Sequence, residues 1–309
     1  MSKLPVWIDC DTGVDDAVAL ILASGLKELE IVGVSTVAGN VELEKTTANT
    51  LRVRDLVGAS WPVYRGAAQP WLRPYHSATL FHGVDGLGGA VLPDPKGTVE
   101  EEAAWDAMYA AAKARPGELE MVCVGPLTNL ANAFVKYPSL PGLLKRVLIM
   151  GGAAVGGNTT PAAEFNIYVD PDAAQAVFRS GVKVWMFGLD VTLPAYLTGE
   201  DVATVTAQGG PVADFVRACT THTLNVVTGF GLPGVSMHDS CPLVYLVHPE
   251  FFEGEEAGVF VETQSELTLG KTVTDLYSDH QFEEKNAVVM YGVNREAFVS
   301  FIGETLKQY

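Results

Sequence analysis

The chain has 309 residues, of which 48% are hydrophobic and 18% charged, and its formal net charge at pH 7 is −17. We expect one globular domain over residues 1–309 and no nucleic-acid partner, because binding to a phosphate backbone needs clustered Lys and Arg. No apolar run reaches the roughly 18 residues that a membrane span needs, and the first residues carry no signal-peptide pattern, so we expect a cytoplasmic protein without a membrane partner.

Four carboxylates crowd around the first predicted turn, at Asp9, Asp11, Asp15 and Asp16. The apolar run 6–8 predicts a buried strand, and helical spacing of apolar residues begins after the last aspartate. Like charges this close need a cation or several hydrogen-bond donors, and oxygen ligands suit Ca2+ or Mg2+ better than zinc. Capping of the helix accounts for one or two of the four, Asp9 among them, but not for the other three together. We therefore expect a metal site here.

Strands and helices alternate from this turn to residue 187, which predicts an α/β fold with a largely parallel, doubly wound (Rossmann-like) sheet. Late apolar runs at 258–262 and 287–291 predict an added antiparallel part. The Gly- and Pro-rich segment 66–97 has no clear period and predicts a long functional loop. We expect the other strands at 29–37, 62–64, 119–124, 147–150 and 182–187, and helices at 42–57 and 103–114, from 170 and from 211 onward, and at 295–306.

Polar or Gly-rich residues follow nearly every predicted strand, so we expect a site at the carboxyl edge of the sheet. Near the end of the chain, His238-Asp239 opens a helix after the Gly-rich break 229–234. A histidine beside a carboxylate can pair a metal ligand with a proton donor, and an Asp cap after an incidental His is an equally good explanation.

Taken in order, the motifs of this chain resemble the inosine-uridine-preferring nucleoside hydrolase family, from Ile8 to about Asp275. The resemblance implies Ca2+-dependent hydrolysis of the N-glycosidic bond of ribonucleosides to ribose and free base, in a homodimer or homotetramer. The motifs that carry it are Asp9-Cys10-Asp11-Thr12-Gly13-Val14-Asp15-Asp16, Val37-Ala38-Gly39-Asn40, His82-Gly83, Gly125-Pro126-Leu127-Thr128-Asn129, Met150-Gly151-Gly152, Asn158, Glu164-Phe165-Asn166, Asp170-Pro171 and His238-Asp239.

The family resemblance also implies the metal ligands and the nucleophile. By position, Ca2+ is bound by Asp11, Asp16, the backbone carbonyl of Thr128, and Asp239. The remaining coordination goes to the ribose hydroxyls and to one water, which is the nucleophile. Asp11 matches the residue that takes the proton of this metal-bound water.

A second set of residues matches those that hydrogen-bond the ribose: Asp15, Asn40, Asn158, Glu164 and Asn166. Acceptors and anions stabilise the positive charge of an oxocarbenium-like transition state, and they would reject 2′-deoxyribose. We expect residues 164–166 to be extended, so that Glu164 and Asn166 point to the same side.

The base side decides the substrate preference. His238 matches the leaving-group acid of the pyrimidine-accepting branch and His82 a base-side histidine of that branch, whereas the purine-specific branch holds the base between tryptophans. Trp71 and Trp105 lie outside the matched motifs, and we interpret them as packing residues. The pattern favours a pyrimidine-accepting or broad (uridine/inosine) preference, with a purine-specific hydrolase as the alternative. The stretch before His238 lacks tyrosine, and its candidates for base contact are Asn225, Thr228 and Phe230.

Two other classes of protein compete with this interpretation. A haloacid-dehalogenase-like Mg2+ phosphatase also begins with two aspartates after its first strand, but it needs Thr or Val where this chain has Gly13, and it uses a lysine. A non-catalytic ribonucleoside-binding protein is the third possibility. The presence of both Asp11 and His238 gives no sign of lost catalysis.

Overall fold

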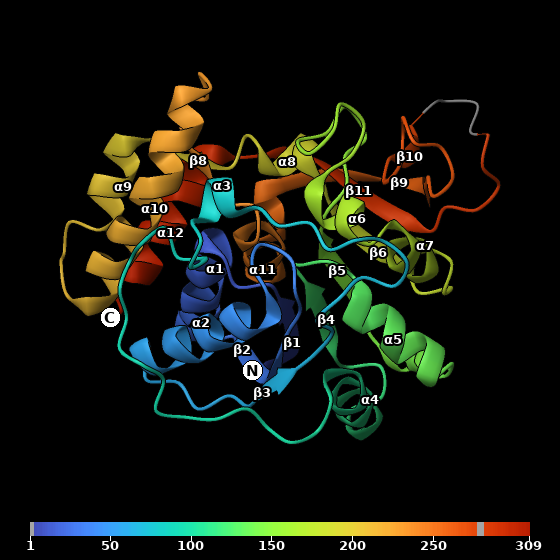
Figure 1. Cartoon of the computed structure of the whole chain (residues 1–309), viewed down its shortest axis with the longest axis horizontal. Helices are drawn as coiled ribbons and strands as arrows, with labels where there is room; N and C mark the ends of the chain where they lie inside the picture. The colour runs from blue at the N-terminus through green and yellow to red at the C-terminus, as the bar shows by residue number, and fades with distance from the viewer. Residues whose placement is uncertain (1–2, 277–280) are drawn as a thin grey trace.

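A nine-stranded sheet in the order β10-β9-β11-β6-β5-β4-β1-β2-β3 runs through the computed structural model, which describes residues 3–276 and 281–309 (Figure 1). All neighbours from β3 to β11 pair in parallel. These strands are β1 (Leu4–Cys10), β2 (Leu29–Thr36), β3 (Val63–Arg65), β4 (Glu120–Cys123), β5 (Arg146–Met150), β6 (Val184–Phe187) and β11 (Ala287–Val293). The order reverses at β1 and β4, and in such sheets ligands bind beyond the carboxyl ends of the strands at this point.

The antiparallel part consists of β9 (Phe252–Val261) and β10 (Thr272–Asp275), at one edge of the sheet. The prediction of a largely parallel, doubly wound sheet with an antiparallel addition is confirmed. The expected late strand at 287–291 is real, but it pairs in parallel with β6 and antiparallel with β9, so it extends the parallel part. The direction of a strand depends on distant partners, which its own residues do not encode.

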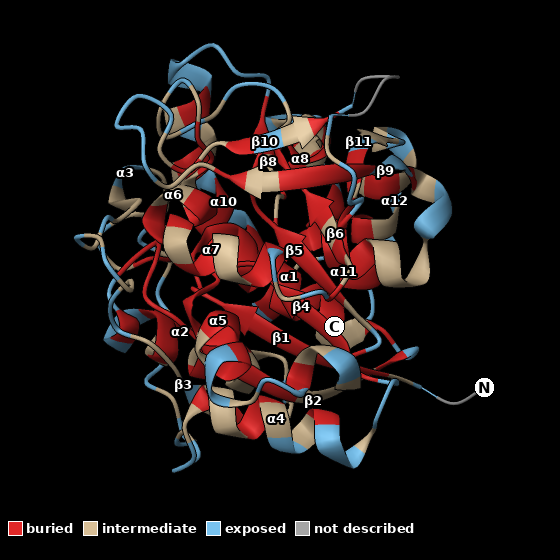
Figure 2. Cartoon of the chain, turned by 90° about the vertical axis from the view of Figure 1, so that its right-hand side faces the viewer, coloured by how far each residue is buried: buried red, intermediate tan, exposed pale blue. Residues whose placement is uncertain are grey.

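Successive residues of the central strands face two separate cores, as expected of a sheet covered on both sides. Val6 and Ile8 belong to one core, and Trp7 between them belongs to the other. Helices α1 (Val14–Gly25), α2 (Leu43–Leu56), α10 (Pro211–Gly229), α11 (Ser240–Val247) and α12 (Arg295–Leu306) contribute to the first core, and α4 (Ala104–Ala114), α5 (Thr128–Lys136) and α7 (Pro171–Phe178) to the second. Figure 2 shows the buried residues concentrated in the sheet and on the inner sides of these helices.

Several short elements connect the main ones, and some of them surround the carboxyl edge of the sheet. Helix α3 (Thr79–His82) interrupts the long loop expected at 66–97. The other short elements are α6 (Phe165–Val169), α8 (Leu189–Thr192), α9 (Gly199–Val205), the 3-10 helices Leu140–Leu143 and Pro249–Phe251, and the two-stranded sheet of β7 (Tyr196–Leu197) and β8 (Val235–Ser236). Across residues 3–276 and 281–309, no helix combines the length and the apolar character that crossing a bilayer requires.

Candidate active site

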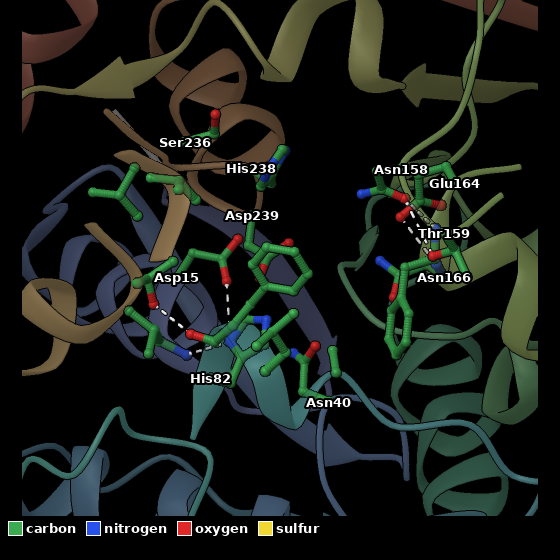
Figure 3. Close-up of a pocket in the computed structure, with 18 of the residues that line it drawn as sticks. Asp15, Asn40, His82, Asn158, Thr159, Glu164, Asn166, Ser236, His238 and Asp239 are labelled. Carbon is green, nitrogen blue, oxygen red and sulfur yellow. Dashed lines mark hydrogen bonds and ion pairs between the residues drawn. The ribbon is translucent and has the colours of Figure 1, made fainter. Parts of the chain in front are cut away.

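A cavity of about 570 Å³ opens at the carboxyl edge of the sheet, where the loops after β1, β2 and β5 meet (Figure 3). Asp11, Asp16 and Thr128 are buried and are not among its lining residues. The other predicted site residues all line it: Asp15, Asn40, His82, Asn158, Glu164, Asn166, His238 and Asp239. The fold therefore brings together residues that lie up to 224 positions apart in the sequence, from Asp15 to Asp239.

Three carboxylates form a close group, and two of them, Asp15 and Asp239, line the cavity. One oxygen each of Asp15, Asp16 and Asp239 lie within 4.8 Å of one another. Asp16 is held by the main-chain amides of Asp11 (3.1 Å) and Gly13 (2.8 Å), and it also accepts a hydrogen bond from the Asn40 side chain. Asp239 stands at the N-cap of α11 but its side chain makes no capping hydrogen bond, so capping does not explain it.

Asp11 adjoins this group with one oxygen unsatisfied. Its Oδ2 accepts the Asn40 main-chain amide at 2.7 Å, whereas its buried Oδ1 has no hydrogen-bond partner among the described residues. The surroundings are tight, because a Cβ added at Gly39 would lie 2.1 Å from Oδ2 and one added at Gly125 would lie 2.7 Å from Oδ1. A buried carboxylate oxygen without a partner is costly, and such an atom fits a ligand position for a cation.

The pKa values of these carboxylates are raised, as expected when several acidic groups are buried together without a positive charge nearby. Burial, and then the charge of Asp16, raise the pKa of Asp15 to about 7 and that of Asp11 well above its usual range. Burial and the charges of Asp15, Asp16 and Asp11 also raise the pKa of Asp239. No Lys or Arg is among the described residues that line the cavity. A hard divalent cation such as Ca2+ would supply the missing positive charge to this all-oxygen set.

Asp9 and Thr128 lie just outside the group. Asp9 is the penultimate residue of β1 and no helix cap, and it accepts hydrogen bonds from Ser35 and Asn129. Thr128 begins α5, and its hydroxyl donates to Asp170 at 2.7 Å. The role of the Thr128 carbonyl as a metal ligand stays a prediction.

Glu164 and Asn166 present hydrogen-bond acceptors to one side of the cavity. Glu164 caps α6, because its carboxylate accepts the main-chain amides of Gly152 (2.9 Å), Asn166 (2.9 Å) and Ile167 (3.2 Å). The expectation of an extended segment at 164–166 is wrong, since α6 begins at Phe165 once this carboxylate binds the first amides. The Asn166 amide group donates to two strand-end carbonyls, so its Oδ1 remains as the acceptor. Burial raises the pKa of Glu164 to about 7.

Asn158 lies on the same side of the cavity as Glu164 and Asn166, across from Asp15 and His82 (Figure 3). Its side-chain oxygen accepts the main-chain amide of Phe165 at 3.0 Å. The two sides leave a space between acceptors that suits a molecule carrying several hydroxyl groups.

Of the three histidines among the described lining residues, His82 and His238 are neutral rings at pH 7. Nδ1 of His82 accepts the Val14 main-chain amide at 3.0 Å, so its hydrogen sits on Nε2. Burial lowers the pKa of His82 to about 3 and that of His238 to about 4. Nδ1 of His238 lies 2.8 Å from the Thr192 hydroxyl. Neutral imidazoles of this kind can donate or accept one hydrogen bond at the second ring nitrogen.

Two of the phenylalanines that line the cavity lie close together. Phe81 of α3 and Phe230 after α10 lie with their ring centroids 6.4 Å apart. The Thr223 hydroxyl of α10 donates to the Phe81 carbonyl at 2.7 Å, which ties the two helices together. Of the three candidates for base contact, Phe230 lines the cavity, but Asn225 and Thr228 do not. A helix exposes only part of its surface to a cavity, and the Thr228 hydroxyl bonds back to its own helix.

Sequence reasoning missed several lining residues, among them His76, Phe81, Phe165 and Thr223. Phe81 and Phe165 each adjoin a residue that the motifs had singled out, which is the signal that could have found them. Trp71 and Trp105 pack against the second core, as expected.

The chain belongs to the inosine-uridine preferring nucleoside hydrolase family, whose model matches residues 6–300. The expected family and the expected activity, hydrolysis of nucleosides, are thereby confirmed. Among curated relatives, the pyrimidine-specific ribonucleoside hydrolases RihA of Shewanella oneidensis and Citrobacter koseri are each 40% identical to it. The alignments cover 99% of this chain in both cases, and 96% and 99% of the relatives.

Solved structures of nucleoside hydrolases share the fold over nearly the whole chain. The plant nucleoside hydrolase PpNRh1 superposes with a TM-score of 0.92 at 29% identity, covering 99% of both chains. A purine-preferring ribonucleoside hydrolase from Gardnerella vaginalis has a TM-score of 0.91 at 30% identity, covering 99% of this chain and 100% of that one. The chain is thus similar to hydrolases whose names state opposite base preferences.

Proposed function

We propose that this nucleoside hydrolase is a Ca2+-dependent ribonucleoside N-ribohydrolase with a pyrimidine-accepting or broad base preference. The observation that supports the calcium dependence is the buried Oδ1 of Asp11. Within residues 3–276 and 281–309 this atom has no hydrogen-bond partner, and Asp11 adjoins the carboxylates of Asp15, Asp16 and Asp239. The names of the RihA relatives support acceptance of pyrimidines. Neutral histidines and phenylalanines, rather than tryptophans, line the base side, which supports the same preference.

The residues that would hold the cation are Asp11, Asp16, Asp239 and the carbonyl of Thr128. When bound, Ca2+ lowers the pKa of a coordinated water and fixes vicinal hydroxyl groups. Asp11 takes the proton of the attacking water, since its carboxylate adjoins the group and the Asn40 amide holds its Oδ2 in place. The geometry of Asp16 is fixed by three donors, so it acts as a rigid ligand.

Ribose lies between the two sides of the cavity in this proposal. Asp15 and Asn40 bind hydroxyl groups on one side, and Asn158, Glu164 and Asn166 bind them on the other. Acceptors on both sides stabilise the positive charge that develops on the sugar as the C1′–N bond breaks. A 2′-deoxyribonucleoside leaves some of these buried groups unpaired, so it is a poor substrate.

The departing base takes the electron pair of the broken bond and needs a hydrogen-bond donor or a proton. His238 provides it from its second ring nitrogen, with proton transfer advancing as negative charge grows on the base. His82, whose hydrogen is on Nε2, contacts the base from the other side. Asp11 then releases to solvent the proton it took from water, and His238 regains from solvent the proton it gave to the base.

The preference for the base is tested by the kcat/KM values for uridine, cytidine, inosine, adenosine and guanosine, measured by ribose release. We expect uridine or cytidine to rank first, with inosine accepted. A ranking in which adenosine and guanosine lead and the pyrimidines are not hydrolysed would favour the purine-specific alternative. A parallel assay of 2′-deoxyuridine should show at least a hundredfold lower kcat/KM.

Assembly and location complete the proposal. We propose a homodimer or homotetramer located in the cytoplasm. Light scattering on the purified protein measures the mass of the assembly. A mass equal to that of one 33.0 kDa chain would contradict the proposed oligomer. Cell fractionation tests the proposed cytoplasmic location.

A further inference from the structure

Helix α8, which follows β6, is held rigidly against the loop that follows β5. The main-chain amide of Leu189 donates to the Gly152 carbonyl at 2.9 Å, and a Cβ added at Gly188 would lie 2.8 Å from that carbonyl oxygen. The Asp190 carboxylate accepts the main-chain amides of Ala154 (2.7 Å) and Val155 (3.0 Å). The last residue of α8 is Thr192, which is fully buried. Because α8 is held in place by these hydrogen bonds, the position of Thr192 is fixed as well.

The segment that carries His238 is fastened to the residues just after α8. Strands β7 and β8 pair antiparallel, with Tyr196 opposite Ser236 and Leu197 opposite Val235. The main-chain amide of Met237 then donates to the Ala195 carbonyl at 2.9 Å. The main chain is thus held on both sides of the contact between Thr192 and His238.

Within that frame, the Thr192 hydroxyl lies 2.8 Å from Nδ1 of His238. In the described part of the chain, Nε2 of this ring has no hydrogen-bond partner, although the residue lines the cavity. A neutral imidazole carries its hydrogen on one nitrogen only, and the partner of the other nitrogen selects which one. A hydroxyl can donate to Nδ1 or accept from it, and the 2.8 Å distance fits both directions; where it donates, the hydrogen of the ring is on Nε2 and a ligand can receive it.

We propose that Thr192 is a positioning residue that holds the His238 ring with Nε2–H directed to the leaving base. The proposal rests on the role proposed above for His238 and adds the residue through which that role is maintained. The competing explanation is that the threonine hydroxyl only satisfies a buried polar ring. The two differ in whether loss of the hydroxyl acts selectively on substrates whose leaving group needs a hydrogen bond.

The test compares uridine with p-nitrophenyl riboside, whose phenolate leaves without protonation. Thr192→Val removes the hydroxyl at nearly constant shape, and Thr192→Ser retains it. Thr220→Val is the matched control, because Thr220 is equally buried but its hydroxyl bonds back to its own helix. We expect Thr192→Val to lower kcat for uridine at least tenfold with KM within about twofold, to leave p-nitrophenyl riboside nearly unchanged, and to be rescued by Thr192→Ser.

Equal losses on both substrates, or no rescue by serine, would overturn the proposal. A parallel assay of His238→Ala separates failure of the role proposed for Thr192 from failure of the role proposed for His238. If His238→Ala slows uridine selectively and Thr192→Val does not, only the role of Thr192 fails. If His238→Ala slows both substrates equally, the leaving-group role of His238 fails, and the positioning role fails with it.

A spectroscopic measurement gives a readout independent of turnover. Long-range proton–nitrogen NMR spectra of protein labelled with 15N-histidine report which nitrogen of each ring carries the hydrogen. We expect the His238 ring to have its hydrogen on Nε2 in the wild type and in Thr192→Ser, and to lose this single state in Thr192→Val. Thr192→Ala replaces the valine variant if the latter does not fold. An unchanged His238 signal in a folded variant without the hydroxyl would contradict the proposal.

Discussion

The main-chain amide of Asn40 donates to Oδ2 of Asp11 at 2.7 Å, while the other oxygen of the same buried carboxylate has no hydrogen-bond partner in the part of the chain that the structure describes. The turn after β2 thereby fixes the residue that follows β1 and leaves Oδ1 available. This arrangement combines a firmly held carboxylate with an unused ligand position, which is what a metal-dependent base requires.

Asp11→Asn should nearly abolish turnover, because the amide can neither take a proton from water nor bring negative charge to the cation. We expect at least a hundredfold loss of kcat and weaker Ca2+ binding by calorimetry. Asp214→Asn, an exposed change on α10, is the control. Near-normal turnover of Asp11→Asn would remove Asp11 from both roles.

Gly39→Ala should displace Asp11, since the new methyl group would lie 2.1 Å from Oδ2. We expect a loss of roughly 1–3 kcal/mol in the free energy of unfolding and a weaker affinity for Ca2+. Gly142→Ala is the matched control, because a Cβ there meets no atom within 4 Å. Equal behaviour of the two variants in urea unfolding and calcium titration would show that the space around Asp11 is not constrained.

Removal of Ca2+ should lower the melting temperature, because a cation that binds only the folded state stabilises it. Scanning calorimetry of protein treated with a chelator should show the drop, and added Ca2+ should reverse it. Mg2+ at the same concentration is the comparison ion. It should restore less of the lost melting temperature, because it prefers a smaller octahedral site. A melting curve that responds to neither ion would argue against a cation among these carboxylates.

The sequence predicted that Asp11, Asp15 and Asp16 lie close together in space, because they are close along the chain and one turn brings them together. It also predicted the parallel sheet, since strands and helices alternate. Prediction from the sequence failed where contacts between distant residues determine the local structure. The examples are the parallel pairing of β11 with β6 and the start of a helix at Phe165. Thr192 carries no local signal at all, because its contact with His238 spans 46 residues.

Stability should depend on pH through Glu164. Burial raises the pKa of this carboxyl from 4.5 to about 7 in the folded protein, so the folded state retains a proton that the unfolded state loses between these pH values. The contribution of Glu164 to the free energy of unfolding should therefore decrease as pH rises from about 4.5 to 7.

In the Glu164→Gln variant the side chain at this position cannot titrate. Comparison with the wild type therefore separates the pH dependence caused by Glu164 from that caused by the aspartates. Urea unfolding of both proteins at matched Ca2+ gives the wild-type minus variant difference, which should be largest near pH 4.5 and decline toward pH 7. A difference that is constant or increases over this range would contradict the raised pKa.

The most direct test of the account is ribose release from uridine by protein treated with a chelator and then given Ca2+. We predict that the chelator abolishes release and that added Ca2+ restores it. Undiminished release from metal-free protein would contradict the proposal that a cation held by Asp11, Asp16 and Asp239 takes part in the reaction.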